Sequence, residues 1–171
     1  MGRKNKRTNK KKVSFVADAS LPDLESTDLA ARSRFNFSYL NELQDGAQSI
    51  AEWNQDGKKD ASLEKLLSNL KDYSTYPLSH WINEGRLTIY GRFPKEKSEF
   101  KHPVNVPHEV SWGRFRLAGK VRLAGFVIPS EFEDTEFTTK SGKKVKYCTN
   151  TFYIVFLDKD HLFYKTEKRN T

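Results

Sequence analysis

The sequence predicts an α+β domain, in which a twisted antiparallel sheet of four or five strands has two helices packed on one side. One observation is a leucine stripe at helical spacing in the first half of the chain, Leu63, Leu66, Leu67 and Leu70. The other is a series of strand-length apolar or alternating runs in the second half, of which residues 151–157 are the most apolar. A chain of 171 residues is long enough for one domain with a hydrophobic core.

The first part of the chain, residues 1–33, is expected to lie outside the folded domain. Residues 1–12 contain seven Lys or Arg and no acidic residue, so they cannot bury apolar surface and should form a disordered basic tail. Such a tail suits either a solubilising role or non-specific attachment to nucleic-acid phosphates. The segment that follows is polar and interrupted by Pro22, as is typical of a linker. We therefore expect a single domain over residues 34–171.

The domain should begin with a strand and continue with helices. Residues 34–40 alternate between aromatic and other side chains, which predicts a strand with Phe35, Phe37 and Tyr39 on one face. Residues 44–54 are expected to form a short helix, and the leucine stripe a longer one. A further helical turn is expected around Trp81.

The second half of the chain should supply the other strands of the sheet. The expected strands are 87–90, 108–117, 121–128 and 151–157. Residues 130–147 lie between the last two and contain the tight-turn sequence Ser141-Gly142, so they should form an extended hairpin that projects from the sheet.

Positive charge gathers on one face of the predicted strand pair. Because side chains alternate along a strand, Trp112, Arg114 and Arg116 share one face, while Phe115 points to the core. The surrounding residues 84–123 contain nine basic and four acidic residues. Guanidinium groups beside an aromatic ring are typical of a surface that binds phosphate and stacks a base, although Trp112 also fits a core position.

Composition argues against several other classes of protein. The sole cysteine, Cys148, cannot form an intramolecular disulfide and suits a reducing compartment. No apolar run approaches the roughly 20 residues of a membrane span, and no signal-peptide pattern follows the basic start, so a cytoplasmic protein without membrane contact is expected. His80, His102 and His108 lack the cysteine partners or paired spacing of a zinc site, so we predict neither a metal nor another cofactor.

Three motifs in the chain resemble those of a known family. They are Glu99–His102, the segment Trp112–Phe126 with Trp-x-Arg-x-Arg followed by Arg122-Leu, and the pair His161 and Tyr164. Together they resemble the RelE/ParE superfamily of bacterial toxins, most closely its YoeB-like mRNA interferase branch. The resemblance implies a RelE-like fold and an RNA-binding endoribonuclease, a hydrolase of a toxin–antitoxin system. Its partners would be mRNA and a cognate antitoxin protein, and dependence on the ribosome stays open.

Cleavage of RNA through its 2′-hydroxyl needs a base, a cation at the phosphate and an acid for the departing oxygen. Glu99 is the expected base, with Glu109 as the alternative. Arg122 is expected to hold the phosphate, since a guanidinium can make two parallel hydrogen bonds to it. His161, with a reference pKa of roughly 6.5, is expected as the acid. The resemblance adds Tyr164 to this catalytic set.

Other basic residues should position the RNA backbone, namely Arg114, Arg116 and Lys120. His161 and Tyr164 lie three residues apart, so a straight strand would place them on opposite faces of the sheet. A turn or bulge at Asp158–Asp160 would be needed for both to act in one site.

Two other functions stay open at this point. A ParE-like protein has the same fold but acts by binding DNA gyrase, and it needs no acid–base set. A non-enzymatic RNA- or partner-binding module would use the cationic face and the basic tail. Convergence of Glu99, Arg122 and His161 on one cleft would favour the nuclease, and their dispersal would favour a binding protein.

Overall fold

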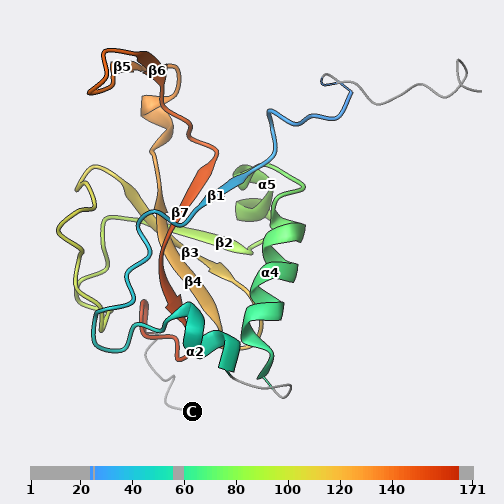
Figure 1. The fold of residues 1–171 in the computed structure, drawn as a ribbon, viewed down its shortest axis with the longest axis vertical. Coiled ribbons are helices and arrows are strands. Elements are labelled where there is room, and N and C mark those ends of the chain that lie inside the picture. Colours follow the sequence, from blue (N-terminus) through green and yellow to red (C-terminus); the bar gives the residue numbers. More distant parts are fainter. Residues whose placement is uncertain (1–23, 25, 56–59, 166–171) are drawn as a thin grey trace, which may run out of the picture. The chain divides into compact units, whose positions relative to one another are not determined.

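The computed structural model describes residue 24, residues 26–55 and residues 60–165 (Figure 1). The chain divides into two units, Met1–Ala30 and Ala31–Thr171. In the first unit the described residues form turns, and the Thr27 hydroxyl donates to the Leu24 carbonyl over 3.3 Å. The predicted basic tail, residues 1–12, lies outside the described residues.

The second unit is built on a five-stranded sheet with the strand order β1-β7-β4-β3-β2. Its strands are β1 (Arg34–Asn36), β2 (Leu87–Gly91), β3 (Ser111–Arg116), β4 (Arg122–Val127) and β7 (Thr151–Asp158). Neighbouring strands from β2 to β7 are antiparallel, as predicted, but β1 pairs with β7 in parallel. The α+β class and the number of strands are therefore confirmed, whereas the expectation of a wholly antiparallel sheet is wrong.

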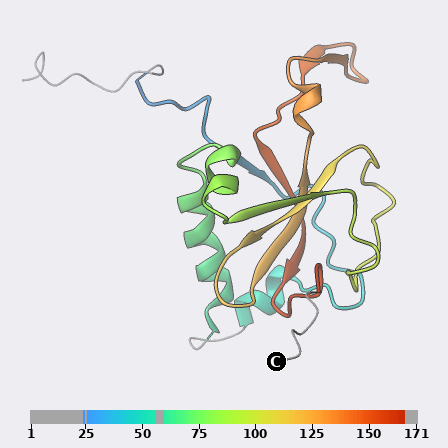
Figure 2. The same cartoon turned by 180° about the vertical axis from the view of Figure 1, so that it is seen from behind.

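Helices cover one face of this sheet (Figures 1 and 2). They are α2 (Ile50–Gln55), α4 (Ser62–Tyr73) and α5 (Leu78–Asn83). α4 matches the helix predicted from the leucine stripe, and α5 is the turn expected around Trp81. α2 covers only the second half of the helix predicted over residues 44–54, because residues 44–49 form turns and a bridge instead. The leucine stripe of α4 buries Leu66 and Leu70 against the sheet, while Leu67 stays 58% exposed at the edge of the stripe.

The first strand is shorter than the alternation of residues 34–40 predicts. It ends at Asn36 because the side-chain oxygen of Asn36 accepts a hydrogen bond from the Ser38 N–H over 2.8 Å and turns the chain. Phe35 consequently packs in the core beneath the helices, whereas Tyr39 packs on the opposite side of the sheet. The expectation that Phe35, Phe37 and Tyr39 share one face is therefore wrong.

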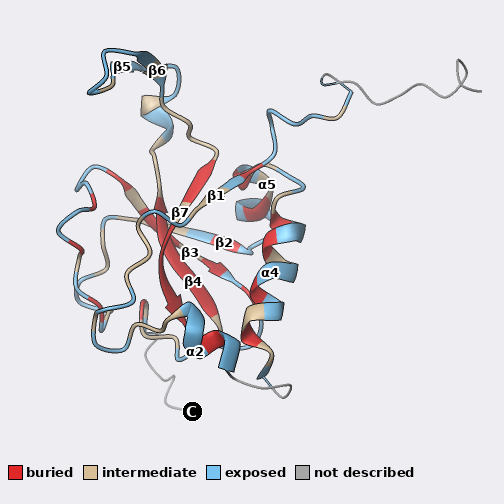
Figure 3. Cartoon of the chain, in the orientation of Figure 1, coloured by how far each residue is buried: buried red, intermediate tan, exposed pale blue. Residues whose placement is uncertain are grey.

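The sheet has a hydrophobic core on each face, and its central strands β4 and β7 are almost entirely buried (Figure 3). Phe115 belongs to the core under the helices, as expected. Trp112, on the other face, is also 1% exposed, because loops rather than helices cover it. The pairing of β4 with β7 shifts register between Ala124 and Gly125, and this bulge sends Val155 and Phe156 both to the loop-covered core.

The predicted hairpin between β4 and β7 is present and projects from the sheet (Figures 1 and 2). It follows a short 3₁₀ turn, η1 (Ser130–Phe132), and consists of β5 (Glu136–Thr138) paired with β6 (Lys144–Lys146). Gly142 has a φ of +80° in the connecting turn, a conformation that suits glycine.

Candidate functional site

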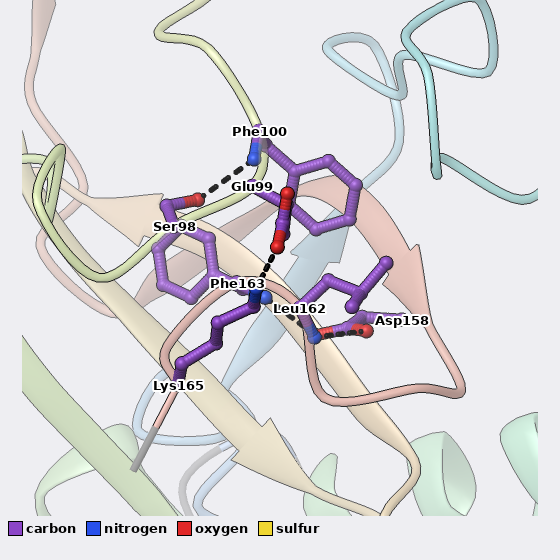
Figure 4. Close-up of polar contacts among 7 residues, drawn as sticks. All are labelled: Ser98, Glu99, Phe100, Asp158, Leu162, Phe163 and Lys165. Carbon is purple, nitrogen blue, oxygen red and sulfur yellow. Dashed lines mark hydrogen bonds and ion pairs between the residues drawn. The ribbon is translucent and has the colours of Figure 1, made fainter. Parts of the chain in front are cut away.

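The chain after β7 folds back as a strap, residues 158–165, over the loop-covered face of the sheet (Figure 4). Asp158 is 1% exposed, and its two carboxylate oxygens accept the N–H groups of Leu162 and Phe163 over 2.8 and 2.9 Å. His161 adopts a left-handed backbone conformation with φ of 64° within this turn. The turn that His161 and Tyr164 require to share a site is therefore present.

A second segment, residues 97–99, pairs with the strap (Figure 4). The Glu99 N–H donates to the Leu162 carbonyl over 3.0 Å, and the Lys165 N–H donates to the Lys97 carbonyl over 2.8 Å. The Glu99 carboxylate forms an ion pair with the Lys165 ammonium, and about half of each side chain is exposed. Glu99 therefore lies beside the strap, but its carboxylate is engaged by a cation and does not contact His161, contrary to what a catalytic base would need.

Arg114 is the centre of the site. One terminal guanidinium nitrogen, Nη1, lies 2.6 Å from His161 Nε2 and 3.4 Å from the Tyr164 carbonyl oxygen. The guanidinium carbon lies 5.7 Å from the centre of the Tyr90 ring and 5.6 Å from that of Tyr164. Since a guanidinium can only donate, His161 Nε2 must accept, and this contact assigns a neutral imidazole with its proton on Nδ1.

The electrostatic surroundings of His161 agree with a neutral ring. Burial lowers the pKa of His161, and the positive charges of Arg114 and Arg122 lower it further. The negative charge of Asp158 opposes this shift only in part. At neutral pH the imidazole is therefore ready to accept a proton, which suits a general base rather than the acid expected from the sequence.

Two tyrosine rings form the floor of the site. Tyr90 and Tyr164 stack with ring centres 4.1 Å apart and planes 6° from parallel. The buried Tyr90 hydroxyl has no hydrogen-bond partner among the described residues, which are 24, 26–55 and 60–165. Burial raises the Tyr90 pKa, although the charge of Arg114 acts in the opposite direction, and the hydroxyl therefore keeps its proton. The Lys97 ammonium lies 5.1 Å from the centre of the Tyr164 ring.

Arg122 has a different role from the one expected. It is 8% exposed, and its guanidinium donates to the carbonyl oxygens of Gly119 and Val121 over 2.7 and 2.9 Å. Burial lowers the Arg122 pKa, and so do the charges of Arg114 and Arg116. Arg122 therefore fixes the β3–β4 turn through Nη1 and adds positive potential to the site.

The remaining predicted residues lie outside this cluster. Arg116 is exposed on β3 directly opposite Arg122. Lys120 is exposed in the β3–β4 turn and lines a cavity at the start of α4 together with Lys159. Glu109, the alternative base, lines an apolar cavity beside the projecting hairpin. None of these side chains contacts Arg114 or His161 in the described structure.

The structure thus brings together Arg114, Arg122, His161 and Tyr164 and adds two residues that sequence reasoning missed, Tyr90 and Lys97. A signal for Tyr90 was present: Leu87 and Ile89 face the helices, so simple alternation places Tyr90 on the cationic face. Lys97 carried no such signal, because only the pairing of its loop with the strap places it there.

Comparisons with known proteins add no family to this description: no protein-family model, curated protein or solved structure gives a match to the chain. Within the part of the chain that the structure describes, no three His, Cys, Asp or Glu side chains are arranged to hold a metal ion. Nor does any helix in these described ranges have the length and apolarity needed to cross a membrane.

Proposed function

We propose that the protein is an endoribonuclease that cleaves single-stranded RNA by attack of a 2′-hydroxyl on the adjacent phosphate. The observation that carries this proposal is the 2.6 Å contact between the Arg114 guanidinium and the unprotonated Nε2 of His161. A phosphate anchor and a proton acceptor are thereby held at adjacent positions above a pair of aromatic rings. This combination serves phosphoryl transfer, because the reaction needs positioning, a base and stabilisation of charge.

In the proposed reaction the RNA phosphate binds the Arg114 guanidinium, and His161 Nε2 takes the proton of the 2′-hydroxyl. The 2′-oxygen forms a bond to phosphorus, and the bond from phosphorus to the 5′-oxygen breaks. The departing oxygen takes a proton from solvent water, because the Tyr90 hydroxyl is buried, and His161 then returns its proton to solvent. Arg114 and Arg122 stabilise the charge that develops on the phosphorane. The products are a 2′,3′-cyclic phosphate and a 5′-hydroxyl.

The resemblance to YoeB-like toxins supports this proposal at the level of element order and motif. A strand, helices and then antiparallel strands follow one another in the chain, and the motif residues Arg114, Arg122, His161 and Tyr164 lie on one face. We extend the proposal to a RelE-like toxin that acts on mRNA and is neutralised by an antitoxin. Induced expression should then arrest growth, and the His161→Ala variant should not.

A non-enzymatic RNA-binding protein is the second candidate. It is favoured by one observation, the ion pair that occupies the Glu99 carboxylate and removes the carboxylate base expected from the sequence. Such a protein would retain the cationic and aromatic contacts of Arg114 but perform no chemistry. It would bind single-stranded RNA with strong salt dependence and leave it intact.

The test is to incubate the full-length protein with single-stranded RNA, alone and on translating ribosomes, and to analyse the product ends. We expect 2′,3′-cyclic phosphate and 5′-hydroxyl ends, with a rate roughly 10²- to 10³-fold lower for Arg114→Ala. Arg114→Lys should restore little, because an ammonium lacks the forked geometry. Arg86→Ala is a matched control, since Arg86 is exposed and its charge acts on Tyr73 beneath the helices. Uncleaved RNA under both conditions would leave the binding protein as the conclusion.

A further inference from the structure

A second cationic and aromatic cavity lies on the loop-covered face, outside the Arg114 site. It has a volume of about 450 Å³ and is lined by Arg92, Phe93, Lys95, His102, His108 and Trp112. No acidic residue lines it. The cavity therefore combines positive charge with aromatic surface, the two properties that single-stranded nucleic acid needs from a binding site.

The aromatic part of the cavity is a short column of rings. His102 and His108 stack with ring centres 4.5 Å apart and planes 13° from parallel. His102 is half-buried and contacts the Trp112 ring at 5.6 Å, whereas His108 is exposed. The column of two imidazoles thus rests edge-on against a core tryptophan and ends at an imidazole accessible to solvent. A nucleobase can extend such a stack, since every base offers a flat aromatic face.

The same geometry argues against a metal site at the two histidines. Parallel stacking turns the faces of the imidazoles toward each other, so their nitrogen atoms do not converge as metal ligands do. His102 also lies against the edge of the Phe93 ring, with ring centres 5.4 Å apart, and this contact helps to hold its orientation. The column therefore works as a surface for stacking.

Arg92 and Lys95 supply the charge of the cavity. Both are exposed, and neither forms a salt bridge to a described carboxylate. Two cations without a carboxylate partner beside a stacking surface match the two parts of a nucleotide, its phosphate and its base.

The cavity adjoins the Arg114 site through continuous aromatic contacts. Phe93 contacts Phe163 at 5.9 Å between ring centres, and Phe163 contacts Tyr90 at 6.2 Å. Trp112 and Arg114 lie two residues apart on the same face of β3, roughly 6 to 7 Å along the strand. One strand of RNA can therefore pass over both sites.

We propose that this cavity is a second nucleotide subsite, in which His108 stacks a base of single-stranded RNA while Arg92 and Lys95 bind its phosphate. The inference rests on the proposed RNA substrate and specifies how that substrate is held next to the phosphate at Arg114. It assigns function to three polar side chains that take no part in the proposed reaction.

The experiment measures binding of a fluorescein-labelled seven-nucleotide RNA by anisotropy, with every 2′-hydroxyl methylated so that attack is blocked. Binding is also measured for a series of oligonucleotides, each of which lacks the base at one position. His108→Ala should weaken binding of the complete oligonucleotide about 5- to 100-fold and abolish the effect of removing one particular base. His108→Tyr should restore both, because it keeps a stacking ring. Lys95→Ala should reduce the slope of log affinity against log salt by about 0.7.

His80→Ala is the matched control, since His80 also stacks on an aromatic ring, Tyr76, but lies in α5 on the helix-covered side. Equal binding by His108→Ala and His80→Ala, or an equal loss at every oligonucleotide position, would overturn the subsite. Cleavage of unmodified RNA together with such a flat pattern would overturn the subsite alone. A position-specific pattern without any cleavage would support the subsite and overturn the nuclease.

Discussion

Removal of the Asp158 carboxylate should destabilise the protein more than removal of any exposed acidic group. The carboxylate is 1% exposed and accepts two backbone N–H groups of the strap. Hydrogen bonds to a charged group contribute about 1.5 to 3 kcal/mol each, so their loss costs up to about 6 kcal/mol if the strap stays in place. If the strap detaches instead, water satisfies the N–H groups but the fully buried Phe163 becomes exposed, at a cost of about 1.5 to 3 kcal/mol.

We therefore expect Asp158→Ala to lower the free energy of unfolding by about 2 to 5 kcal/mol, measured by urea denaturation. Asp158→Asn should be intermediate, because the amide oxygen can still accept one N–H while its NH₂ group faces the other. Asp160→Ala is the matched control: Asp160 is exposed and accepts one hydrogen bond from Gln48 Nε2 over 3.0 Å. Its loss should cost less than about 1 kcal/mol.

The strap also carries His161, so the same variant links stability to the proposed chemistry. Asp158→Ala protein that is still folded should cleave RNA more slowly, because His161 is no longer held against Arg114. A stability loss indistinguishable from that of Asp160→Ala would refute the structural role given to this carboxylate. Normal cleavage by a folded Asp158→Ala protein would refute the role given to the strap.

Three further predictions concern His161, Cys148 and Gly125. The pKa of His161 is lowered, so the rate of cleavage should rise with pH through an inflection below about 6.5 and then level off. The free energy of unfolding should fall when the pH is lowered below that value, because the unfolded chain binds the proton more readily than the folded chain. His161→Gln should weaken this pH dependence of stability. Burial acts to raise the Cys148 pKa, but hydrogen bonds from Thr151 and Asn150 and the charge of Arg34 lower it overall. Iodoacetamide should therefore alkylate Cys148 at neutral pH, and Arg34→Ala should slow the alkylation. Gly125→Ala should destabilise the protein by about 1 to 3 kcal/mol in thermal or urea unfolding, since the added Cβ would lie 2.1 Å from the Tyr153 carbonyl oxygen, while Gly142→Ala, where the new Cβ meets open space, should cost less despite its positive φ.

The strands and helices of this chain could be predicted because their side-chain periodicities agree with their burial. The run 151–157 becomes the buried strand β7, and the leucine stripe becomes the inner face of α4. The parallel pairing of β1 could not be predicted, since it depends on a partner more than 100 residues away rather than on the local sequence. Alternation also fails where the chain turns, as it does after Asn36.

The positions of the candidate site residues could be predicted in part. Motif spacing selected Arg114, Arg122, His161 and Tyr164, and the structure places these residues on one face of the sheet. Motif spacing could not show that backbone carbonyls occupy Arg122 or that Lys165 pairs with Glu99, because these contacts depend on how loops fold. The function of a polar side chain depends on which of its hydrogen-bonding groups remain available, and a sequence motif does not contain that information.

Availability also explains why Arg114, rather than Arg122, is suited to receive a phosphate. A phosphate that bound Arg122 through Nη1 would have to replace two carbonyl acceptors at 2.7 and 2.9 Å. At Arg114 it would replace a neutral imidazole nitrogen and one long contact of 3.4 Å. The exchange at Arg114 frees His161 Nε2, and the negative charge of the phosphate raises the His161 pKa. Substrate binding would therefore increase the proton affinity of the proposed base at the moment when the 2′-hydroxyl is brought next to it.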